Sequence, residues 1–428
     1  MAHMKNNPLC LSSFILLIIL LFSFSGCREE SVSGNNVATE VADGSDISIT
    51  AEKMAAATAT SSLTVTEEMI DLGIQNPGSL YRLTKVMERA ANGEDITIAY
   101  IGGSITDGSS ASPKETCCYA YLSTQWWKDT FPDATITYIN AGIGATDSYL
   151  GVHRLRDDVL TYEPDLVITE FSVNDFQARN KETYESLLRS ILNSEKEPAV
   201  IALLLGTQQR YNYATEHAQV AFKLNVSTIN YAAVLSDGME NGSIPWEVVG
   251  NPDGVHPNNE GHALIACLLT NFYRDVLSAA ATTTYPVYTV PEDRLTKSRY
   301  ENADLLYASE ITPVSMEGFS EAAIPSALSC TDGWSTDCGG SISFEVTCRE
   351  AGIVFYQTTD GCSGQYDVFV DNSYVTTIDA DYKNGWGNCC DYVECFKNDA
   401  SETHLITLKP AEDSTGTSFA ICGICVGY

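Results

Sequence analysis

Basic residues are scarce in this chain of 428 residues. Its 24 lysines and arginines stand against 56 aspartates and glutamates, so the formal net charge is -32. A chain this acidic repels phosphate backbones and anionic lipid headgroups, and we expect no nucleic-acid partner. Charged residues of both signs make up only 19% of the chain and hydrophobic residues 44%, which indicates folded domains rather than a disordered chain.

Apolar runs long enough to cross a membrane are also missing beyond the first thirty residues. The one long run, residues 9–25, follows Lys5 and leads into small residues, which is typical of a secretory signal. Its end, Phe24-Ser25-Gly26-Cys27, resembles a bacterial lipobox, in which the cysteine is acylated and becomes the new N-terminus. Such boxes prefer leucine where this chain has Phe24. An uncleaved signal anchor is the alternative, because a run of this length almost spans a bilayer.

Large apolar residues are nearly absent from the segment that follows. Residues 28–63 are mostly Ser, Thr, Ala, Asn and acidic residues, which predicts a flexible stalk. We therefore expect a signal peptide at 1–26 and a stalk at 27–64. The protein would be exported and held at the bacterial cell surface by lipid on Cys27, its only link to a membrane. The remaining length favours two domains.

Strand and helix patterns alternate in the first of these domains, residues 65–283. The expected strands are Ile96–Gly102, 134–140, 165–172 and 199–206, and the expected helices are Tyr119–Thr130, 149–161, 183–194, 216–235 and 259–277. This alternation predicts a parallel sheet with helices on both faces, a three-layer α/β/α sandwich. Ligands bind such sheets at the carboxyl ends of the strands. Polar residues at those ends are therefore candidates for a site.

Small and polar residues follow three of the expected strands. Gly102-Gly103-Ser104 follows the first, and its two glycines allow a tight turn that exposes the serine hydroxyl near a helix N-terminus. A small-residue loop, 140–146, follows the second and can point backbone N–H groups at a ligand. Asn174 follows the third, in Ser172-Val173-Asn174-Asp175. Each block alone also fits an ordinary turn, connection or helix cap.

Histidine is scarce as well, with six in the chain, and one of them has a carboxylate nearby in sequence. His256 lies three residues after Asp253, in a loop broken by Gly254 and Pro257. An aspartate in this position can fix the tautomer of a histidine that takes a proton from a serine. The four blocks together, in this order, indicate a serine hydrolase.

The same blocks resemble those of the SGNH (GDSL-like) hydrolase superfamily, in the branch whose first block reads Gly-Gly-Ser-Ile-Thr. The resemblance covers roughly residues 96–280. It implies a flavodoxin-like α/β fold with Ser104 as nucleophile, His256 as general base and then acid, and Asp253 as the residue that orients His256. It also implies that neither a metal nor an organic cofactor is needed.

The oxyanion hole implied by the resemblance combines the Ser104 N–H, the Asn174 side-chain amide and one N–H of the second block. Here the sequence departs from the family. The usual glycine, five residues after Asn140, is Ala145 in this chain, with Gly144 beside it. A backbone donor survives the extra methyl group if φ stays negative. We expect Ala145 as the donor, with Gly144 as the alternative. Ser172 likewise stands where the family usually has glycine.

The second domain, residues 284–428, lacks helical patterns. Short alternating segments predict a β-sandwich, with strands at 341–346, 353–357, 366–370, 376–379, 404–408 and 419–426. It looks like the jelly-roll of the two-domain acetyl esterases of carbohydrate esterase family two, where the sandwich precedes the hydrolase. Trp334, Tyr382 and Trp386 lie in glycine-rich loops and are candidates for stacking on sugars. Packing at the sandwich edge is the commoner role for any one of them.

Together these features predict a serine esterase that removes O-acetyl groups from plant-type polysaccharides or oligosaccharides through an acyl-serine intermediate. The acidity favours a neutral partner such as acetylated xylan or mannan over acidic pectin. One alternative is an SGNH esterase or lipase acting on lipid, aryl or thioester substrates. The other is a non-catalytic, glycan-binding surface lipoprotein, against which the presence of all four of Ser104, Asn174, Asp253 and His256 argues.

Overall fold

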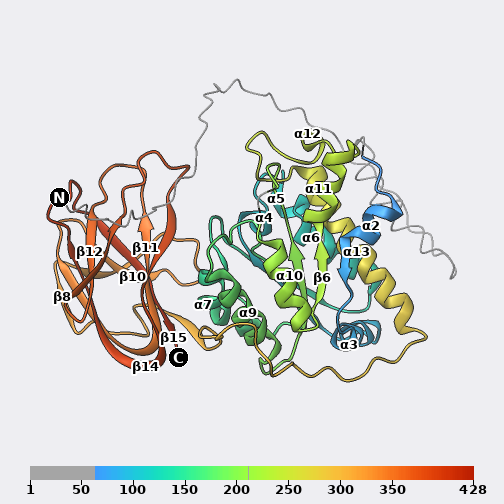
Figure 1. Ribbon diagram of the computed structural model, residues 1–428, viewed down its shortest axis with the longest axis horizontal. Coiled ribbons are helices and arrows are strands. Elements are labelled where there is room, and N and C mark those ends of the chain that lie inside the picture. Colours follow the sequence, from blue (N-terminus) through green and yellow to red (C-terminus); the bar gives the residue numbers. More distant parts are fainter. Residues whose placement is uncertain (1–62, 211) are drawn as a thin grey trace, which may run out of the picture. The chain divides into compact units, whose positions relative to one another are not determined.

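The computed structural model describes residues 63–210 and 212–428 (Figure 1). The predicted signal peptide, the lipid attachment site Cys27 and all but the last two residues of the predicted stalk lie outside the described residues. An α/β domain comes first in the chain, and an antiparallel β domain follows it.

A six-stranded sheet forms the centre of the α/β domain. Five strands run parallel, namely β2 (Ile96–Gly102), β3 (Ile136–Gly142), β4 (Leu166–Glu170), β5 (Ala199–Leu204) and β6 (Ser227–Asn230). A short edge strand, β1 (Ile74–Asn76), pairs antiparallel with β6. The order across the sheet is β1-β6-β5-β4-β2-β3. Every residue of β4 and β5 is buried, as expected for central strands covered on both faces.

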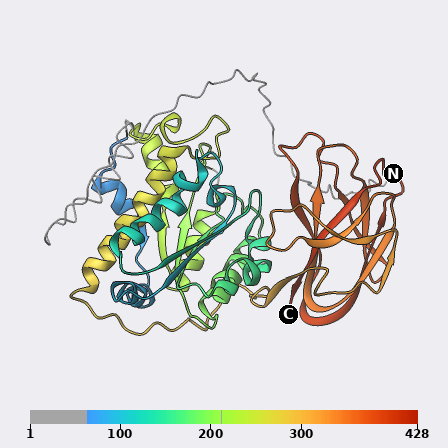
Figure 2. The ribbon, with the colours of Figure 1, turned by 180° about the vertical axis from the view of Figure 1, so that it is seen from behind.

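Helices cover both faces of this sheet, as Figures 1 and 2 show. One face packs against α3 (Tyr81–Ala91), α6 (Tyr119–Thr130), α11 (Tyr231–Asn241) and α13 (Asn259–Ala280). The other packs against α7 (Ser148–His153), α9 (Asn180–Leu192) and α10 (Ala214–Lys223). The shorter helices are α2 (Glu67–Gly73), α4 (Ser104–Asp107), α5 (Lys114–Cys117), α8 (Leu155–Asp158) and α12 (Trp246–Val249). The predicted three-layer α/β/α fold is confirmed.

Helix α13 is long and apolar enough to cross a membrane by length and composition alone. Half of its apolar stretch is buried inside the protein, and it packs against α6 and α3. It is therefore described here as a core helix of the α/β domain.

The prediction of one helix over 216–235 is wrong. Helix α10 ends at Lys223, Asn225 adopts a left-handed φ of 53°, and strand β6 follows before α11 begins. Asparagine tolerates this conformation better than most residues, so it can end a helix abruptly. The predicted helix 149–161 is also broken, into α7, α8 and a 3₁₀ turn at Leu160–Tyr162.

The chain reverses its direction of travel across the sheet at β2. From β2 it passes to β3 on one side and then returns to β4 on the other. The carboxyl end of β2 is therefore the topological switch point, where open α/β sheets form their binding crevice. The first candidate residue, Ser104, lies directly after this strand end.

The named strands of the β domain all pair antiparallel. Its strands are β7 (Ala303–Leu306), β8 (Ser315–Glu317), β9 (Ser320–Ala323), β10 (Asp332–Thr336), β11 (Ser341–Gln357), β12 (Gln365–Val370), β13 (Ser373–Asp379), β14 (Cys389–Pro410) and β15 (Phe419–Gly427). The order is β13-β12-β14-β11-β15-β10-β9, with β7 on β15 and β8 on β11. The predicted sandwich is confirmed, although 341–346 and 353–357 belong to one long strand, β11. Bulges interrupt its pairing with β14 at Cys348/Glu350 and Ala351/Gly352.

The segment between the domains, residues 281–302, runs along α9. The Arg189 guanidinium donates to the carbonyls of Pro291 and Asp293, at 2.7 and 2.6 Å. The Glu185 carboxylate accepts the N–H groups of Leu295 and Thr296. The first part of the predicted second domain thus packs on the α/β domain, and the first strand begins only at residue 303.

The apolar core behind α7, α9 and α10 continues into the β domain. Leu305, Val354, Cys422 and Cys425 belong to the same buried cluster as these helices. Every residue of α7 is buried.

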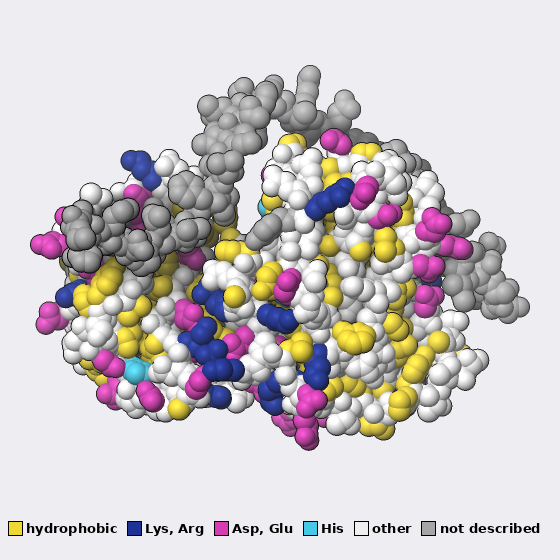
Figure 3. Space-filling view, in the orientation of Figure 1, with side chains coloured by type: hydrophobic (Ala, Val, Ile, Leu, Met, Phe, Trp, Pro, Cys, Tyr) yellow, Lys and Arg dark blue, Asp and Glu magenta, His cyan; other side chains and the backbone are white. Residues whose placement is uncertain are grey.

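On the outside, much of the face in Figure 3 is neither acidic nor basic, in keeping with the low fraction of charged residues.

Candidate active site

Two glycines position Ser104 at the end of β2. A Cβ atom on Gly102 would lie 2.5 Å from the Glu170 carbonyl oxygen, and one on Gly103 would lie 2.2 Å from the Asn174 side-chain oxygen. Neither position has room for a side chain. The carboxyl end of β2 therefore packs closely against the carboxyl end of β4. Ser104 is the first residue of α4, which ends after one turn at Gly108, with φ 99°.

The block that contains Asp253 and His256 forms a tight loop between α12 and α13. The Gly254 N–H donates to the Asn251 carbonyl at 3.0 Å, and the Asn251 N–H donates to the His256 carbonyl at 2.9 Å. The Trp246 indole N–H also reaches the Asn251 carbonyl, at 2.7 Å. Gly254 has a φ of 73°, which favours glycine. The loop thereby turns Asp253 and His256 to the same side.

Ser104, His256 and Asp253 form a continuous chain of hydrogen bonds. Ser104 Oγ and His256 Nε2 are 2.8 Å apart, and His256 Nδ1 and Asp253 Oδ2 are 2.7 Å apart. Asp253 Oδ1 accepts the backbone N–H groups of Val255 and His256. The structure thus brings Ser104 into contact with His256, which lies 152 positions later in the sequence.

The charge on Asp253 is favoured by its surroundings. Desolvation raises the pKa of its carboxyl, but the His256 and Val255 backbone N–H groups and the His256 ring outweigh this, and the pKa lies below its usual value. An ionised Asp253 that accepts from Nδ1 leaves Nε2 of His256 free to take the Ser104 proton.

Segments that carry the candidate oxyanion donors lie beside Ser104 at the neighbouring strand ends. The side chain of Asn174 lies against Gly103, and its amide N–H₂ has no acceptor among the described residues. A Cβ atom on Gly144 would lie 3.8 Å from Ser104 Cβ, so the second-block loop borders the serine. The N–H groups of Gly144 and Ala145 also lack an acceptor within the described part of the chain.

One premise about this loop is corrected by the structure. Ala145 has a φ of 61°, in the left-handed region, rather than the negative φ expected for it. Its methyl group therefore adds strain to the loop instead of being accommodated without cost. Gly144 and Ala145 both remain candidates for the second oxyanion donor.

Polar side chains hold these strand ends together, and one of them, Arg154, was not a candidate from the sequence. The Arg154 guanidinium, fully buried, donates to the carbonyls of Ala141 and Gly102 at 2.7 and 3.0 Å, and pairs with Asp158. Asn140 donates to the Thr106 carbonyl of α4 at 2.8 Å. The local pair with Asp158 does not reveal this role of Arg154, because the two carbonyls it reaches belong to β2 and β3.

Two further side chains tie β4 to its neighbours. Ser172, which replaces the usual glycine, exchanges hydrogen bonds with the Leu205 carbonyl and N–H at 2.9 and 2.7 Å. Glu170 is fully buried beneath α4 and accepts from the Thr106 hydroxyl at 3.1 Å. Desolvation raises the pKa of Glu170 to about 7.

The three aromatic residues predicted to bind sugar differ in exposure. The prediction that Trp334 stacks on sugar is wrong, because its side chain is fully buried in the core of the β domain. Its ring centroid lies 4.8 Å from that of Phe344. Trp386 is 62% exposed, and the ring of Tyr382 lies against Gly385 in the same loop. Trp386 and Tyr382 remain predicted substrate contacts.

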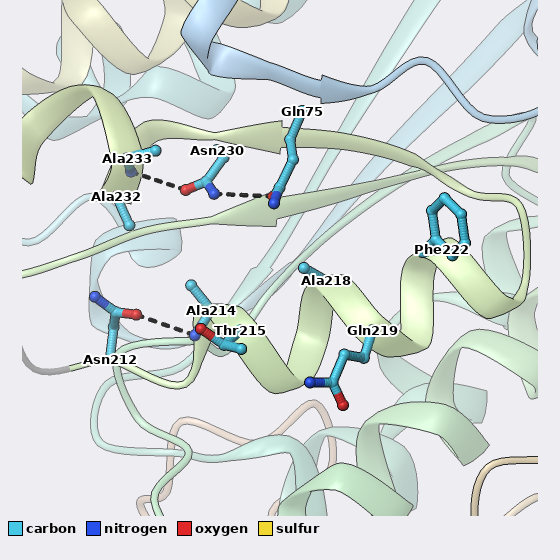
Figure 4. Close-up of a pocket in the computed structure, with 10 residues that line it drawn as sticks. All are labelled: Gln75, Asn212, Ala214, Thr215, Ala218, Gln219, Phe222, Asn230, Ala232 and Ala233. Atoms are coloured by element: carbon cyan, nitrogen blue, oxygen red, sulfur yellow. Dashed lines mark hydrogen bonds between the residues drawn. The ribbon is translucent and has the colours of Figure 1, made fainter. Parts of the chain in front are cut away.

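A separate groove of about 450 Å³ lies along α10, and none of its lining residues belongs to the triad (Figure 4). Side-chain amides of Gln75, Asn212, Gln219 and Asn230 line it together with the exposed Phe222. Asn230 and Gln75 bond to one another, at 2.9 Å. Within the described residues, no group of three His, Cys, Asp or Glu side chains is arranged to hold a metal ion.

Comparisons with known proteins identify the family of this chain. The sequence pattern of the GDSL-like lipase/acylhydrolase family matches residues 100–264. No curated protein matches the chain. Among solved structures, a two-domain esterase described as active on acetylated mannans is 33% identical, with a TM-score of 0.75, and the match covers 84% of this chain and 98% of that one.

A second structure of that esterase, co-crystallised with mannopentaose, matches equally, at 33% identity and a TM-score of 0.75, over 84% of this chain and 97% of that one. An acetylxylan esterase from Geobacillus stearothermophilus is 21% identical, with a TM-score of 0.35, over 42% of this chain and 94% of that one. The similarity to the two-domain esterase runs through both domains. This chain is accordingly an ester hydrolase that belongs to the GDSL-like (SGNH) lipase/acylhydrolase family.

Proposed function

We propose that this protein is a serine esterase that removes O-acetyl groups from neutral plant polysaccharides, with acetylated mannan as the first candidate and acetylated xylan as the second. The hydrogen-bonded chain from Ser104 through His256 to Asp253 is the observation that carries the proposal. Similarity over both domains to an esterase active on acetylated mannans supports the substrate class.

Acylation begins at the Ser104 hydroxyl. His256 Nε2, 2.8 Å away, accepts the proton as Ser104 Oγ attacks the acetyl carbonyl carbon. The carbonyl oxygen becomes an oxyanion and gathers hydrogen bonds from the Asn174 amide, the Ser104 N–H and one N–H of residues 144–145. Each such donor contributes about 2.7–4 kcal/mol to lowering the barrier. Collapse of the intermediate breaks the bond to the sugar oxygen, which takes the proton from His256 and leaves as a hydroxyl group.

Deacylation repeats these steps with water. His256 removes a proton from a water molecule that attacks the acetyl-serine, and the same donors stabilise the second oxyanion. Acetate leaves as Ser104 regains its proton. Asp253 stays ionised throughout and orients the imidazole through Nδ1, 2.7 Å from its Oδ2.

Acyl-chain length and sugar identity test the substrate class. We expect 4-nitrophenyl acetate to be hydrolysed with a kcat/KM at least about 100-fold above that of the octanoate, because a deacetylase needs room for little more than a methyl group. Acetate release from acetylated mannan should exceed that from acetylated xylan and from acetylated pectin. A preference for octanoate would instead identify a lipase-like esterase, and no hydrolysis of any ester would identify a glycan-binding protein.

We also propose export and lipid attachment at Cys27, on the strength of the N-terminal sequence. In a bacterial host, the full-length chain should incorporate radiolabelled palmitate and fractionate with membranes. Cys27→Ser should lose the label while the hydrolase activity is retained. Label on the serine variant, or a soluble wild-type chain, would contradict lipid attachment at this cysteine.

A further inference from the structure

The second-block loop that borders Ser104 ends at Asp147. This residue caps α7: its Oδ1 accepts the N–H groups of Tyr149 and Leu150 at 3.1 and 3.2 Å. Asp147 is buried, and only two residues separate it from Gly144. The direction of its carboxylate therefore constrains the path of the loop that carries the candidate oxyanion donors.

A residue of the β domain holds the other oxygen of this carboxylate. The Tyr392 hydroxyl, on β14, donates to Asp147 Oδ2 at 2.6 Å. Asn180, at the start of α9, donates to the same oxygen at 2.9 Å. The bond from Tyr392 joins residues 245 positions apart and links the β domain directly to the end of the second-block loop.

Tyr392 is itself held in place from several sides. Its ring stacks on the ring of Tyr149 in α7, with centroids 4.4 Å apart and an interplanar angle of 16°. The Arg179 guanidinium lies over both rings and donates to the Tyr392 hydroxyl at 2.7 Å. Tyr392 thus presents a polarised hydroxyl in a fixed orientation rather than a rotating surface side chain.

The opposite side of the loop is fixed by the residue next to Asn174. Asp175 Oδ1 accepts the Ser148 N–H at 2.8 Å, and Asp175 Oδ2 is bonded to His217 Nε2 at 2.8 Å. The start of α7 is therefore joined to the third block by Asp175 and to the β domain by Tyr392. The loop between, with its left-handed Ala145, is the kind of strained segment that persists only when its surroundings over-determine it.

We propose that Tyr392 of the β domain is a positioning residue for the oxyanion hole, acting through Asp147 on the loop of Gly144 and Ala145. The inference rests on the proposed function and deepens it, because it gives the β domain a part in catalysis besides any contact with sugar. Tyr392 does not touch Ser104; it fixes the carboxylate that ends the donor loop.

Tyr392→Phe in the full chain tests this directly, because the ring stack on Tyr149 is kept and only the hydroxyl is lost. Tyr300→Phe is a matched control. The Tyr300 hydroxyl also donates to a carboxylate, Glu394, and accepts from a cation, Lys397, but it has no bond to the donor loop. Both variants should be folded at the assay temperature, checked by circular dichroism and thermal unfolding.

With 4-nitrophenyl acetate, Tyr392→Phe should lower kcat by about 10- to 100-fold and leave KM within about twofold, since a displaced donor weakens the transition state rather than ground-state binding. Tyr300→Phe should keep a kcat within about twofold of wild type. A small aryl ester is the probe because it reports on the hole without requiring contact between the β domain and a polysaccharide.

Two results would overturn the proposal: an equal kcat for the two variants, or a defect in Tyr392→Phe that appears only as a raised KM on acetylated mannan. Ser104→Ala is assayed beside them. An active Ser104→Ala would refute the proposed function and this inference with it, whereas an inactive one beside a fully active Tyr392→Phe refutes the inference alone.

Asp147→Asn provides a second route if Tyr392→Phe does not fold. Its side-chain oxygen can still accept from the Tyr149 and Leu150 N–H groups, while an amide replaces the acceptor that Tyr392 uses. The same loss of kcat with unchanged KM is expected. A wild-type kcat in this variant would contradict a role for the Asp147 carboxylate in positioning the loop.

Discussion

At the scale of single residues, the proposed oxyanion hole depends on donors that have no partner among the described residues. The Asn174 amide lies against Gly103, beside the serine, and has no acceptor among the described residues. A donor without a protein partner is available to a group that forms during the reaction. An oxyanion that forms only in the transition state is such a group.

Asn174→Ala should therefore lower kcat by about 10²–10³-fold and change KM little, since the lost bond matters mainly in the transition state. Steady-state kinetics with 4-nitrophenyl acetate would measure both constants. Asn212→Ala is the matched control, because it removes an amide from the loop after β5, in the groove along α10. A raised KM with unchanged kcat for Asn174→Ala would rule out the oxyanion role.

Asp253→Asn should lower kcat on the order of 10⁴-fold, because an amide can stabilise the wrong tautomer of His256 and cannot stabilise the imidazolium. Since the pKa of Asp253 lies below its usual value, its protonation should not limit activity in the weakly acidic range. A pH–rate profile of the wild type is the check. An acid limb that disappears in Asp253→Asn while substantial activity remains would contradict this assignment.

Sequence alone pointed to candidate residues that lie in short local motifs. Ser104, Asn174, Asp253 and His256 each lie in a compact block, and the fold brings these blocks to one end of the sheet. The prediction for Trp334 failed because its burial depends on Phe344 and the rest of the β-domain core, which a glycine-rich loop does not reveal. The left-handed φ of Ala145 could not be predicted from the sequence either.

At the scale of elements, the strand ends around the serine are joined by buried polar groups rather than by apolar packing alone. Glu170, the last residue of β4, is the clearest case. One of its oxygens accepts from Thr106 in α4, and the other, Oε1, has no partner among the described residues. A carboxyl in this setting is more stable neutral than charged.

The pKa of Glu170, raised to about 7 by desolvation, predicts a specific pH dependence. The folded protein keeps the proton between about pH 4.5 and 7 while the unfolded chain loses it, so this residue lowers stability as the pH rises through that window. Denaturant unfolding of the wild type and of Glu170→Gln measures this effect. The free energy of unfolding of the variant, relative to that of the wild type, should rise by about 2–3 kcal/mol between pH 4.5 and 8. A difference that does not change with pH would contradict a neutral Glu170.

Long elements with a clear periodicity were predicted closely, and short or bent ones were not. Strand β2 and helix α6 have the predicted bounds. Strand β6 was missed because four residues between two helices carry too little pattern, and a left-handed Asn225 ends α10 without a glycine or proline signal. The bulges in β11 hid one long strand as two short ones.

At the scale of the whole molecule, the two domains share buried polar contacts as well as an apolar core. Glu350 on β11 accepts from the Tyr149 hydroxyl at 3.1 Å and pairs with His153 of α7; Glu350 and His153 are fully buried. Sequence gives no hint of this pair, whose members are 197 positions apart. Contacts at such separation cannot be read from local patterns.

Glu350→Ala should lower the free energy of unfolding by about 3–5 kcal/mol, because it leaves a buried histidine without its charged partner. Urea unfolding, followed by tryptophan fluorescence, measures the change. Glu402→Ala, on the exposed part of β14, should change it by less than about 0.5 kcal/mol. Equal effects of the two substitutions would mean that the buried pair adds nothing to the stability of the molecule.

The central claim is that Ser104 is the nucleophile of a polysaccharide deacetylase, and acetate release from acetylated mannan tests it most directly. The full chain and its Ser104→Ala variant would be incubated with the polysaccharide, with circular dichroism confirming that both are folded. We expect steady acetate release by the wild type and none above background by the variant. Equal release by both proteins, or none by the wild type, would contradict it.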